Sequence, residues 1–306
     1  MKKLKKHLNK MLEANITNLI ALNKGNKNIT YFCETNKGKY VIKFLTPQFL
    51  LKRVDVEYFQ KIYNIIITLN NSNPKFIAPL TNTNIYSVNK WGDRYFSIFH
   101  FINSDDDHSI NRTHIKEMAK IMNQFHNMAS DLQCNLECMF DKYVSKLFKN
   151  RNYKCMLNPY YQDYKSINQQ LNTCLIHGDF AINNVLFKGN DIVGLIDFDC
   201  LSNGSREEEL IRACRNFENK LDKQTFVSTY LKSCPIKLNL TRDIVKKFII
   251  KDFINEVCVY YFQTKIKNLE SKDFKTLLNQ SIKEFANIDK LIDEIWEIIK
   301  YENSIC

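Results

Sequence analysis

The residues best suited to chemistry gather in one stretch, 175–199, which reads LIHGDFAINNVLFKGNDIVGLIDFD. Asp179 follows a short apolar run, Asn184 stands five residues later, and Asp197 follows two further apolar segments. Those two segments, with a Lys-Gly-Asn-Asp turn between them, predict a β-hairpin, and a hairpin brings its two ends together. The three side chains are therefore expected to converge. Two carboxylates and an amide oxygen suit a magnesium ion, with one carboxylate left to act as a base.

The order and spacing of these residues resemble the catalytic region of protein kinases, which reads H-R-D, then Asn five residues after the Asp, then D-F-G. This chain has H-G-D ending at Asp179, then Asn184, then D-F-D beginning at Asp197. The H-G-D form, the I-D-F-D sequence and the interval of 18 residues between the two aspartates resemble the superfamily of aminoglycoside phosphotransferases, choline kinases and homoserine kinases.

The resemblance implies an α+β fold of the protein-kinase type with two lobes. Residues 1–102 would form an N-terminal lobe around an antiparallel sheet, which binds the nucleotide. Residues 103–306 would form a larger, mainly α-helical lobe for catalysis and acceptor binding. Patterns along the chain agree, because segments 29–34 and 39–45 are strand-like with a turn between them, and the apolar period becomes helical from Ser109.

Other segments of the first lobe carry less regular signals. Residues 1–22 are predicted to form one or two short helices, because the first leucines of the chain recur at helical spacing. Three further strands are predicted over residues 76–80, 85–89 and 95–101, where apolar and aromatic residues dominate.

The resemblance assigns a role to Lys43, which lies on the strand 39–45 in the place of the kinase Lys that reaches the nucleotide phosphates. On composition alone, Lys43 would be a solvated residue on a hairpin of a Lys-rich chain. In the kinase arrangement, an acidic residue of the next helix pairs with this Lys. Over the predicted helix 48–69 we expect that residue to be Glu57, with Asp55 as the alternative, although a solvated helix face would explain both acids.

Two further sets of nucleotide contacts are expected from the resemblance. The loop 24–28 would cover the phosphates through its backbone N–H groups, with a single glycine where protein kinases have G-x-G-x-x-G. The strand that ends near residue 102 would meet the adenine. The candidate contacts are Gly25, Asn26 and Asn28 in the loop and Phe99, His100, Phe101 and Ile102 at the strand.

The implied reaction is ATP-dependent phosphorylation of a hydroxyl group on a small molecule such as an amino alcohol, a hydroxy amino acid or a sugar. Asp179 would orient the hydroxyl or accept its proton, and Asn184 and Asp197 would hold one or two Mg²⁺ ions. Asp199 is either a further metal ligand or an exposed carboxylate at a strand end. Antibiotic phosphotransferase and protein Ser/Thr kinase are the alternatives, although no A-P-E-type activation segment follows Asp197. A nucleotide-binding scaffold without activity is disfavoured, because the residues that carry the chemistry are all present.

Acidic residues of the second lobe have two interpretations each. The superfamily usually shows an Arg and, three residues later, an Asp that braces the catalytic loop, and Arg206 and Glu209 fit this pattern with Glu in place of Asp. Acids in a first helical turn are also favoured by the helix dipole alone, and Ser205 is a suitable N-cap. Asp252 and Glu256, one turn apart, would either bind an amine of the acceptor beside aromatic side chains or serve packing and surface charge.

The composition argues against several other classes. With 306 residues, of which 44% are hydrophobic and 25% charged, the chain has an ordinary globular composition and room for two cores. The formal charge of +11 comes from lysines interleaved with acids, without an Arg-rich run, so no nucleic-acid partner is expected. The ten cysteines form no C-x-x-C pair, and no apolar run approaches the roughly 20 residues of a membrane span. We therefore expect a cytoplasmic protein with reduced thiols and no membrane partner.

Overall fold

The computed structural model divides the chain into two compact units. It describes residues 1–22, 29–47, 54–105, 110–130, 132, 136, 139–167, 171–266 and 288–305. The first unit comprises Met1–Asp107 with Val185–Asp199, and the second comprises His108–Asn184 with Cys200–Cys306. The stretch 175–199 is thereby shared, because its first part belongs to the second unit and its hairpin and last aspartates belong to the first.

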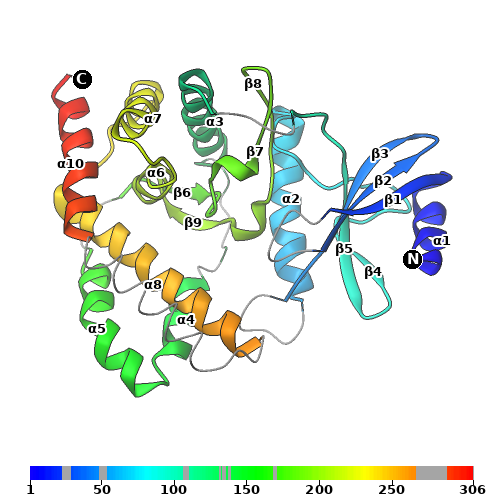
Figure 1. Ribbon diagram of the computed structural model, residues 1–306, viewed down its shortest axis with the longest axis horizontal. Coiled ribbons are helices and arrows are strands. Elements are labelled where there is room, and N and C mark those ends of the chain that lie inside the picture. The colour runs from blue at the N-terminus through cyan, green and yellow to red at the C-terminus, as the bar shows by residue number, and fades with distance from the viewer. Residues whose placement is uncertain are drawn as a thin grey trace. The chain divides into compact units, whose positions relative to one another are not determined.

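The first unit is built on a five-stranded antiparallel sheet with the strand order β1-β2-β3-β5-β4 (Figure 1). Its strands are β1 (Ile16–Leu22), β2 (Ile29–Thr35), β3 (Gly38–Phe44), β4 (Asn89–Trp91) and β5 (Arg94–His100). The predicted hairpin of segments 29–34 and 39–45 is confirmed as β2 and β3, whose register pairs Thr30 with Lys43. On its other side β3 pairs with β5, so Lys43 lies on a central strand of the sheet.

The expectation of helix over residues 1–22 is wrong in its second half. Helix α1 (Lys2–Leu12) ends at Glu13, which adopts a left-handed conformation with φ of 48° and donates its N–H to the carbonyl of Asn9. The chain then turns, and Ile16–Leu22 pairs with β2 as β1. No Gly or Pro marks this helix end in the sequence, because a Glu takes the conformation that Gly or Asn usually takes.

The predicted strands 76–80 and 85–89 are also wrong, whereas 95–101 corresponds to β5. Phe76 forms an isolated parallel bridge with Leu195 and belongs to no strand, and the neighbouring N–H of Ile77 donates to the carbonyl of Leu195. Residues 85–88 are irregular, and β4 begins only at Asn89. Both segments are apolar because they are buried against other elements, and burial alone does not specify a strand.

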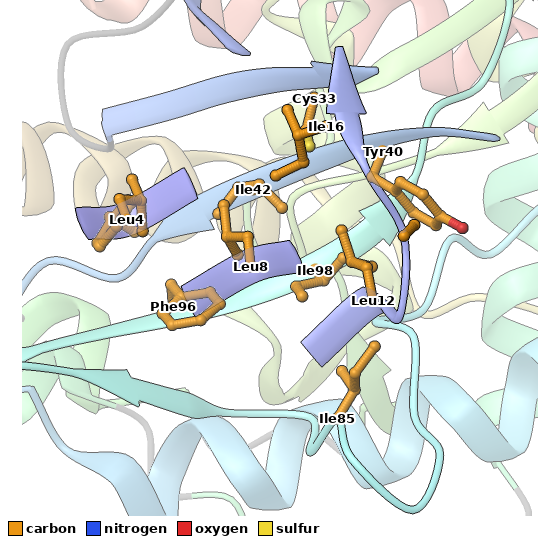
Figure 2. Packing of buried hydrophobic residues seen from close by; sticks show 12 residues of the cluster. Leu4, Leu8, Leu12, Ile16, Cys33, Tyr40, Ile42, Ile85, Phe96 and Ile98 are labelled. Atoms are coloured by element: carbon orange, nitrogen blue, oxygen red, sulfur yellow. The ribbon is translucent and has the colours of Figure 1, made fainter. Parts of the chain in front are cut away.

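The leucines of α1 share the core of the sheet. Leu4, Leu8 and Leu12 recur every four residues on one face of the helix, and each is at most 8% exposed. They pack with strand residues such as Ile42 and Ile98, which are fully buried (Figure 2). The opposite face of α1 carries its lysines, so the helix covers the sheet with a typical amphipathic pattern.

A helix and a hairpin complete the first unit. Helix α2 (Val56–Ser72) begins where the side chain of Asp55 accepts the N–H of Tyr58, and the expected earlier start falls on residues 48–53, outside the described residues. The hairpin predicted within the stretch 175–199 is confirmed as β7 (Val185–Lys188) and β8 (Asp191–Leu195).

The second unit is mainly helical, which confirms the expected α+β fold class. Its helices are α3 (Arg112–Ser130), α4 (Met139–Leu147), α5 (Arg151–Lys165), α6 (Arg206–Cys214), α7 (Lys220–Ser233), α8 (Arg242–Ile266) and α10 (Ile288–Ile305). A two-stranded sheet joins β6 (Thr173–Ile176) to β9 (Ser202–Ser205) (Figure 1). Helix α6 packs against α7 and α8, directly after β9. Within the described part of the chain, every helix is too short or too polar to cross a membrane.

If α1 contributes to the core as packed here, replacement Leu8→Ala will lower the free energy of unfolding by about 2–5 kcal/mol, because it leaves a cavity under the helix. Lys6→Ala, an exposed change on the same helix, is the matched control and should cost less than about 0.5 kcal/mol. Urea unfolding measures both. Equal costs for the two variants would show that α1 does not pack on the sheet.

Candidate active site

The ammonium of Lys43 lies between two carboxylates of the first unit. Its Nζ atom is 2.8 Å from Oδ1 of Asp197 and 2.8 Å from Oδ1 of Asp199, and its side chain is only 12% exposed. Burial would lower the pKa of Lys43, but attraction to Asp199 and Asp197 outweighs burial and raises the pKa. Lys43 is therefore a permanently charged, largely buried group and not a solvated lysine on a hairpin.

The two aspartates reach Lys43 because the chain turns sharply after β8. Asp197 has a φ of 64°, a left-handed conformation that costs most L-residues energy and that Asp tolerates better than most. A 3-10 turn over Phe198–Cys200 follows at once. Strained backbone of this kind concentrates at functional sites. The side chain of Asp199 is 19% exposed, so Asp199 is not the exposed strand-end carboxylate that was one of its two interpretations.

Helix α2 contacts Asp199 through two tyrosines. The hydroxyl of Tyr63 donates to Oδ1 of Asp199 at 3.5 Å, and the hydroxyl of Tyr58 donates to the backbone carbonyl of Asp199 at 3.3 Å. Burial and the charge of Asp199 raise the pKa of Tyr63, so its hydroxyl stays protonated and keeps its proton to donate. Sequence reasoning missed both tyrosines. Their signal is a polar hydroxyl within the apolar stripe of a helix, which calls for a hydrogen-bond partner.

The structure does not bring Glu57 and Lys43 together. Glu57 is exposed in the first turn of α2, and the ion pairs of Lys43 with described residues are those with Asp197 and Asp199. Asp55, the alternative, is exposed and caps the helix. Both acids are placed where a helix N-terminus favours negative charge, which is sufficient to explain them.

Of the residues expected to contact the nucleotide, the structure describes those at the end of β5 but not those of the loop 24–28. Gly25, Asn26 and Asn28 lie outside the described residues.

At the end of β5, by contrast, the candidate side chains are placed. Phe99 is half-buried, with its ring edge-on to that of Tyr63 at 6.0 Å between centroids. Phe101 is 37% exposed and packs edge-on against Phe32, at 5.0 Å between centroids, while Ile102 is half-buried. These residues offer a partly exposed apolar surface at the end of the central sheet.

In the second unit, a buried carboxylate holds the loop that contains His177, Gly178 and Asp179, called the HGD loop below (residues 177–180). Glu209 accepts the N–H of His177 at 2.9 Å and the N–H of Gly178 at 2.6 Å, and its other close partner is Nε2 of His126 at 2.8 Å. Glu209 is fully buried. Burial would raise the pKa of Glu209, but its hydrogen bonds to His126 and Gly178 and the nearby His177 lower it. The bracing role expected of Glu209 is thus present in the structure.

Helix α6, which carries Glu209, is fixed at its N-terminus. The hydroxyl of Ser205 accepts the N–H of Glu208 at 3.1 Å, as expected of an N-cap. Arg206 is buried and donates to the side chain of Asn127 at 2.7 Å and to the carbonyl of His126 at 3.2 Å, both on α3. Arg206 therefore ties α6 to α3, and Glu209 alone of the expected Arg/acid pair touches the HGD loop.

Gly178 is required by the shape of the HGD loop. Its φ is 78°, in the left-handed region, and a Cβ atom at this position would overlap the backbone carbonyl oxygen of Cys200. No other residue fits both conditions, which is the physical reason for the glycine of H-G-D.

Asp179 and Asn184 are brought together within the second unit. The amide nitrogen of Asn184 donates to the backbone carbonyl of Asp179 at 2.8 Å. Asp179 itself is exposed and Asn184 is half-buried. Asp197 belongs to the other unit, so the convergence of all three side chains at one point stays a prediction.

The two acids considered for binding an acceptor amine, Asp252 and Glu256, form ion pairs with arginines of this chain. Asp252 is 5% exposed and pairs with two guanidinium groups, those of Arg212 at 2.7 Å and Arg215 at 3.0 Å. Glu256, with its side chain 39% exposed, pairs with Arg215 at 3.1 Å. For Asp252 the structure favours the packing interpretation.

Comparisons with known proteins were made by sequence family and by fold, and both find phosphotransferases. The model of the phosphotransferase enzyme family (APH) matches residues 18–230. No relative was found among curated protein sequences.

Solved structures with this fold include kinases of several acceptors. Choline kinase LicA from Streptococcus pneumoniae is 15% identical, with a TM-score of 0.67 over 94% of this chain and 98% of that one. Spectinomycin phosphotransferase APH(9)-Ia, in complex with ADP and spectinomycin, is 15% identical, with a TM-score of 0.60 over 99% and 98% of the two chains. Macrolide 2'-phosphotransferase MphH from Brachybacterium faecium is 8% identical, with a TM-score of 0.61 over 90% and 95%. Identities this low show a shared fold.

The fit of Gly178 predicts that Gly178→Ala will destabilise the protein more than Gly189→Ala. Gly189 also has a positive φ, 57°, but a Cβ atom added there would have no neighbour within 4 Å, so its replacement measures backbone strain alone, about 1–2 kcal/mol. Urea unfolding compares the two. Equal costs would mean that the Cys200 carbonyl gives way to the added methyl group.

The lowered pKa of Glu209 predicts a pH-dependent contribution to stability. A carboxylate whose folded pKa lies below its ordinary value of 4.5 contributes stability above pH 4.5, and the contribution disappears as the pH falls through the folded pKa. Replacement Glu209→Gln should therefore cost about 3 kcal/mol at pH 7 and progressively less below pH 4.5. Glu297→Gln, at an exposed pair with Lys220, is the control and should cost less than about 1 kcal/mol. A Glu209→Gln cost that does not shrink with acid would contradict the assignment.

Proposed function

Because the chain belongs to the phosphotransferase enzyme family, we propose that it transfers a phosphoryl group from ATP to a hydroxyl group of a small molecule such as an amino alcohol, a hydroxy amino acid or a sugar. The observation that carries the proposal is the ammonium of Lys43 at 2.8 Å from both Asp197 and Asp199. On nucleotide binding, the two carboxylates can turn to a divalent cation, and phosphate oxygens can replace them beside the ammonium, so that Lys43 keeps negatively charged partners.

The side chains present fit a nucleotide that arrives with Mg²⁺. This ion usually takes one or two protein carboxylates and completes its shell with phosphate oxygens and water. Asp197 supplies a carboxylate, and Asp199 is a second candidate. Asn184 donates its amide nitrogen to the carbonyl of Asp179, which leaves its amide oxygen as the atom for the ion. When bound, Mg²⁺ would neutralise phosphate charge and align the triphosphate.

Asp179 is the proposed catalytic residue. It is exposed, as a group must be to meet an acceptor, while the peptides around it are held by Glu209 and Asn184. Its carboxylate would orient the acceptor hydroxyl and accept its proton as the phosphoryl group is transferred. A rigid backbone beneath a reactive carboxylate favours catalysis, because orientation is fixed before the substrate binds.

The two predicted lobes would have different roles in the reaction. Residues 1–102 would bind the nucleotide through Lys43, with Phe99, Phe101 and Ile102 as candidates for the adenine contact. Residues 103–306 would supply Asp179 and the acceptor site, and the hairpin that carries Asp197 joins the first unit by its contacts.

An antibiotic O-phosphotransferase is the second candidate. Two of the solved structures that share the fold carry the names of spectinomycin and macrolide phosphotransferases, and the third is a choline kinase. Specificity for an acceptor resides in the site and not in the fold, so the shared fold is compatible with either function.

The purified protein should form ADP from Mg²⁺-ATP in the presence of at least one member of a panel of amino alcohols, hydroxy amino acids, sugars and aminoglycosides. Protection of a susceptible host from the same antibiotics distinguishes the second candidate. A folded protein that produces ADP with no acceptor of the panel would contradict the proposal.

Replacement Asp179→Asn should lower turnover by about 10²–10⁴-fold, the usual contribution of a general base, and leave ATP binding within a factor of about three. Asp191→Asn, an exposed change in the turn of the neighbouring hairpin, is the matched control and should leave turnover unchanged. Calorimetric titration and coupled ADP detection give the two readouts. Near-native turnover of a folded Asp179→Asn protein would refute the role of Asp179.

A further inference from the structure

The carbonyl of Gly178 has a charged partner that neither the sequence motif nor the proposed reaction assigns. Nη1 of Arg212 donates to this carbonyl oxygen at 2.7 Å. Arg212 lies three residues after Glu209 on α6, so one helix face presents a carboxylate and a guanidinium to the same loop. Glu209 accepts a hydrogen bond from the N–H of Gly178, and Arg212 donates one to its C=O.

The N–H, the C=O and the Cα of Gly178 are consequently all constrained by neighbouring groups. Its N–H is bound by Glu209, its C=O by Arg212, and its Cα lies against the carbonyl of Cys200. The carbonyl of Gly178 belongs to the peptide group that leads into Asp179. A rotation of that peptide would redirect the Asp179 side chain, and the bond to Arg212 opposes the rotation.

The next two carbonyls of the HGD loop also receive side-chain donors. Asn184 donates to the carbonyl of Asp179 at 2.8 Å, and Asn216 donates to the carbonyl of Phe180 at 2.9 Å. Of these three donors Arg212 is the charged one, and hydrogen bonds from ionised donors are about twice as strong as those from neutral donors.

A buried acid anchors Arg212. Asp252 Oδ1 accepts from Nε of Arg212 at 2.8 Å and lies 2.7 Å from its Nη2. The Asp252 carboxylate also binds Arg215 at 3.0 Å, and Arg215 pairs with Glu256 at 3.1 Å. A continuous series of charged contacts therefore runs from the half-exposed Glu256 on α8 to the peptide before Asp179.

The geometry requires an arginine. One edge of the guanidinium, Nε and Nη2, faces Asp252, while Nη1 faces Gly178. A lysine has a single ammonium on a flexible stem and does not present donors in two fixed directions. An ion pair that only held α6 to α8 would use the edge toward Asp252 and would have no need of the third nitrogen.

We propose that Arg212 is a positioning residue, which acts with Glu209 as a clamp of opposite charges on Gly178 and so holds Asp179 in its reactive orientation. The inference rests on the proposed function, in which Asp179 acts on the acceptor hydroxyl. Arg212 does not touch the reacting atoms. Its loss should lower kcat and leave the KM for ATP nearly unchanged, because most of the nucleotide contacts proposed above, those of Lys43, Asp197 and the end of β5, come from the first unit.

Hydrogen exchange of the full-length protein tests the clamp without reference to activity. In Arg212→Met, the backbone amides of residues 177–180 should exchange about tenfold faster or more than in the native protein, because a charge-assisted bond to the loop is lost. Lys223→Met is the matched control, since it also removes a buried cation from an ion pair, with the partly exposed Glu294 at 2.8 Å, but lies outside the loop contacts. It should leave exchange of the loop within about twofold of native.

Arg212→Lys separates positioning from general stabilisation. A lysine retains the positive charge beside Asp252 and should recover most of the stability, while loop exchange and kcat stay impaired by about tenfold. If Arg212→Met fails to fold, Arg212→Lys carries the test alone. Loop exchange in the Arg212 variants equal to that in Lys223→Met would overturn the proposal. If the native protein phosphorylates no acceptor, the proposed function fails, and the exchange result still decides whether Arg212 holds the loop.

Discussion

A carboxylate without access to water, that of Glu209, holds the backbone from which the proposed base projects. It accepts hydrogen bonds from two successive N–H groups of the HGD loop and shares a third with Nε2 of His126. A buried charge is tolerated only when hydrogen bonds replace the water that it has lost, and here the loop itself supplies them. The conformation of the loop and the ionisation of Glu209 are thus one property. The positive φ of Gly178 and the donors on the loop carbonyls follow from this arrangement.

The charge balance at Lys43 differs from that of the protein-kinase arrangement. There, an acid of the helix after the Lys strand balances the ammonium. Here the two aspartates after β8 balance it, and α2 contributes neutral tyrosine hydroxyls to Asp199. Helix α2 therefore acts on this group through tyrosine hydroxyls, and Tyr63 interacts electrostatically with Lys43 as well as with Asp199. Because Tyr63 is 2% exposed and ringed by aromatic neighbours, its position is set by packing.

The sequence predicted what depends on local spacing. The H-G-D loop, the hairpin β7–β8, the pair β2–β3 and the cap Ser205 were all accessible, because turn residues, alternation and capping act over a few residues. The family and fold class followed from the same motif. The end of α1 was not accessible, since Glu13 adopts a conformation that its side chain does not favour. The apolar pattern predicts strands over the buried irregular segments 76–80 and 85–88, because burial and strand pairing leave the same apolar signal.

For the site, residue type alone misled where several acids were available. Glu57 matched the expected role, but its place in the first helical turn leaves it exposed. Tyr63 and Arg212 were missed for the opposite reason. Neither belongs to a recognised spacing, and their roles arise from partners 136 and 34 residues away in the chain. Contacts of that separation are a property of the folded molecule. The apolar stripe of α2 indicates that the Tyr63 hydroxyl needs a hydrogen-bond partner, but it does not identify the partner.

The central claim is that the Lys43 group and the Asp179–Asn184 loop act on one metal-bound nucleotide. A crystal structure of the protein grown with Mg²⁺ and ADP tests this most directly. We expect one Mg²⁺ bound by both Asp197 and Asn184, at roughly 2.1 Å as is usual for this ion, with the Lys43 ammonium on a phosphate oxygen. A nucleotide bound elsewhere, or an ion that touches Asp197 while Asn184 and Asp179 face away from it, would contradict the claim.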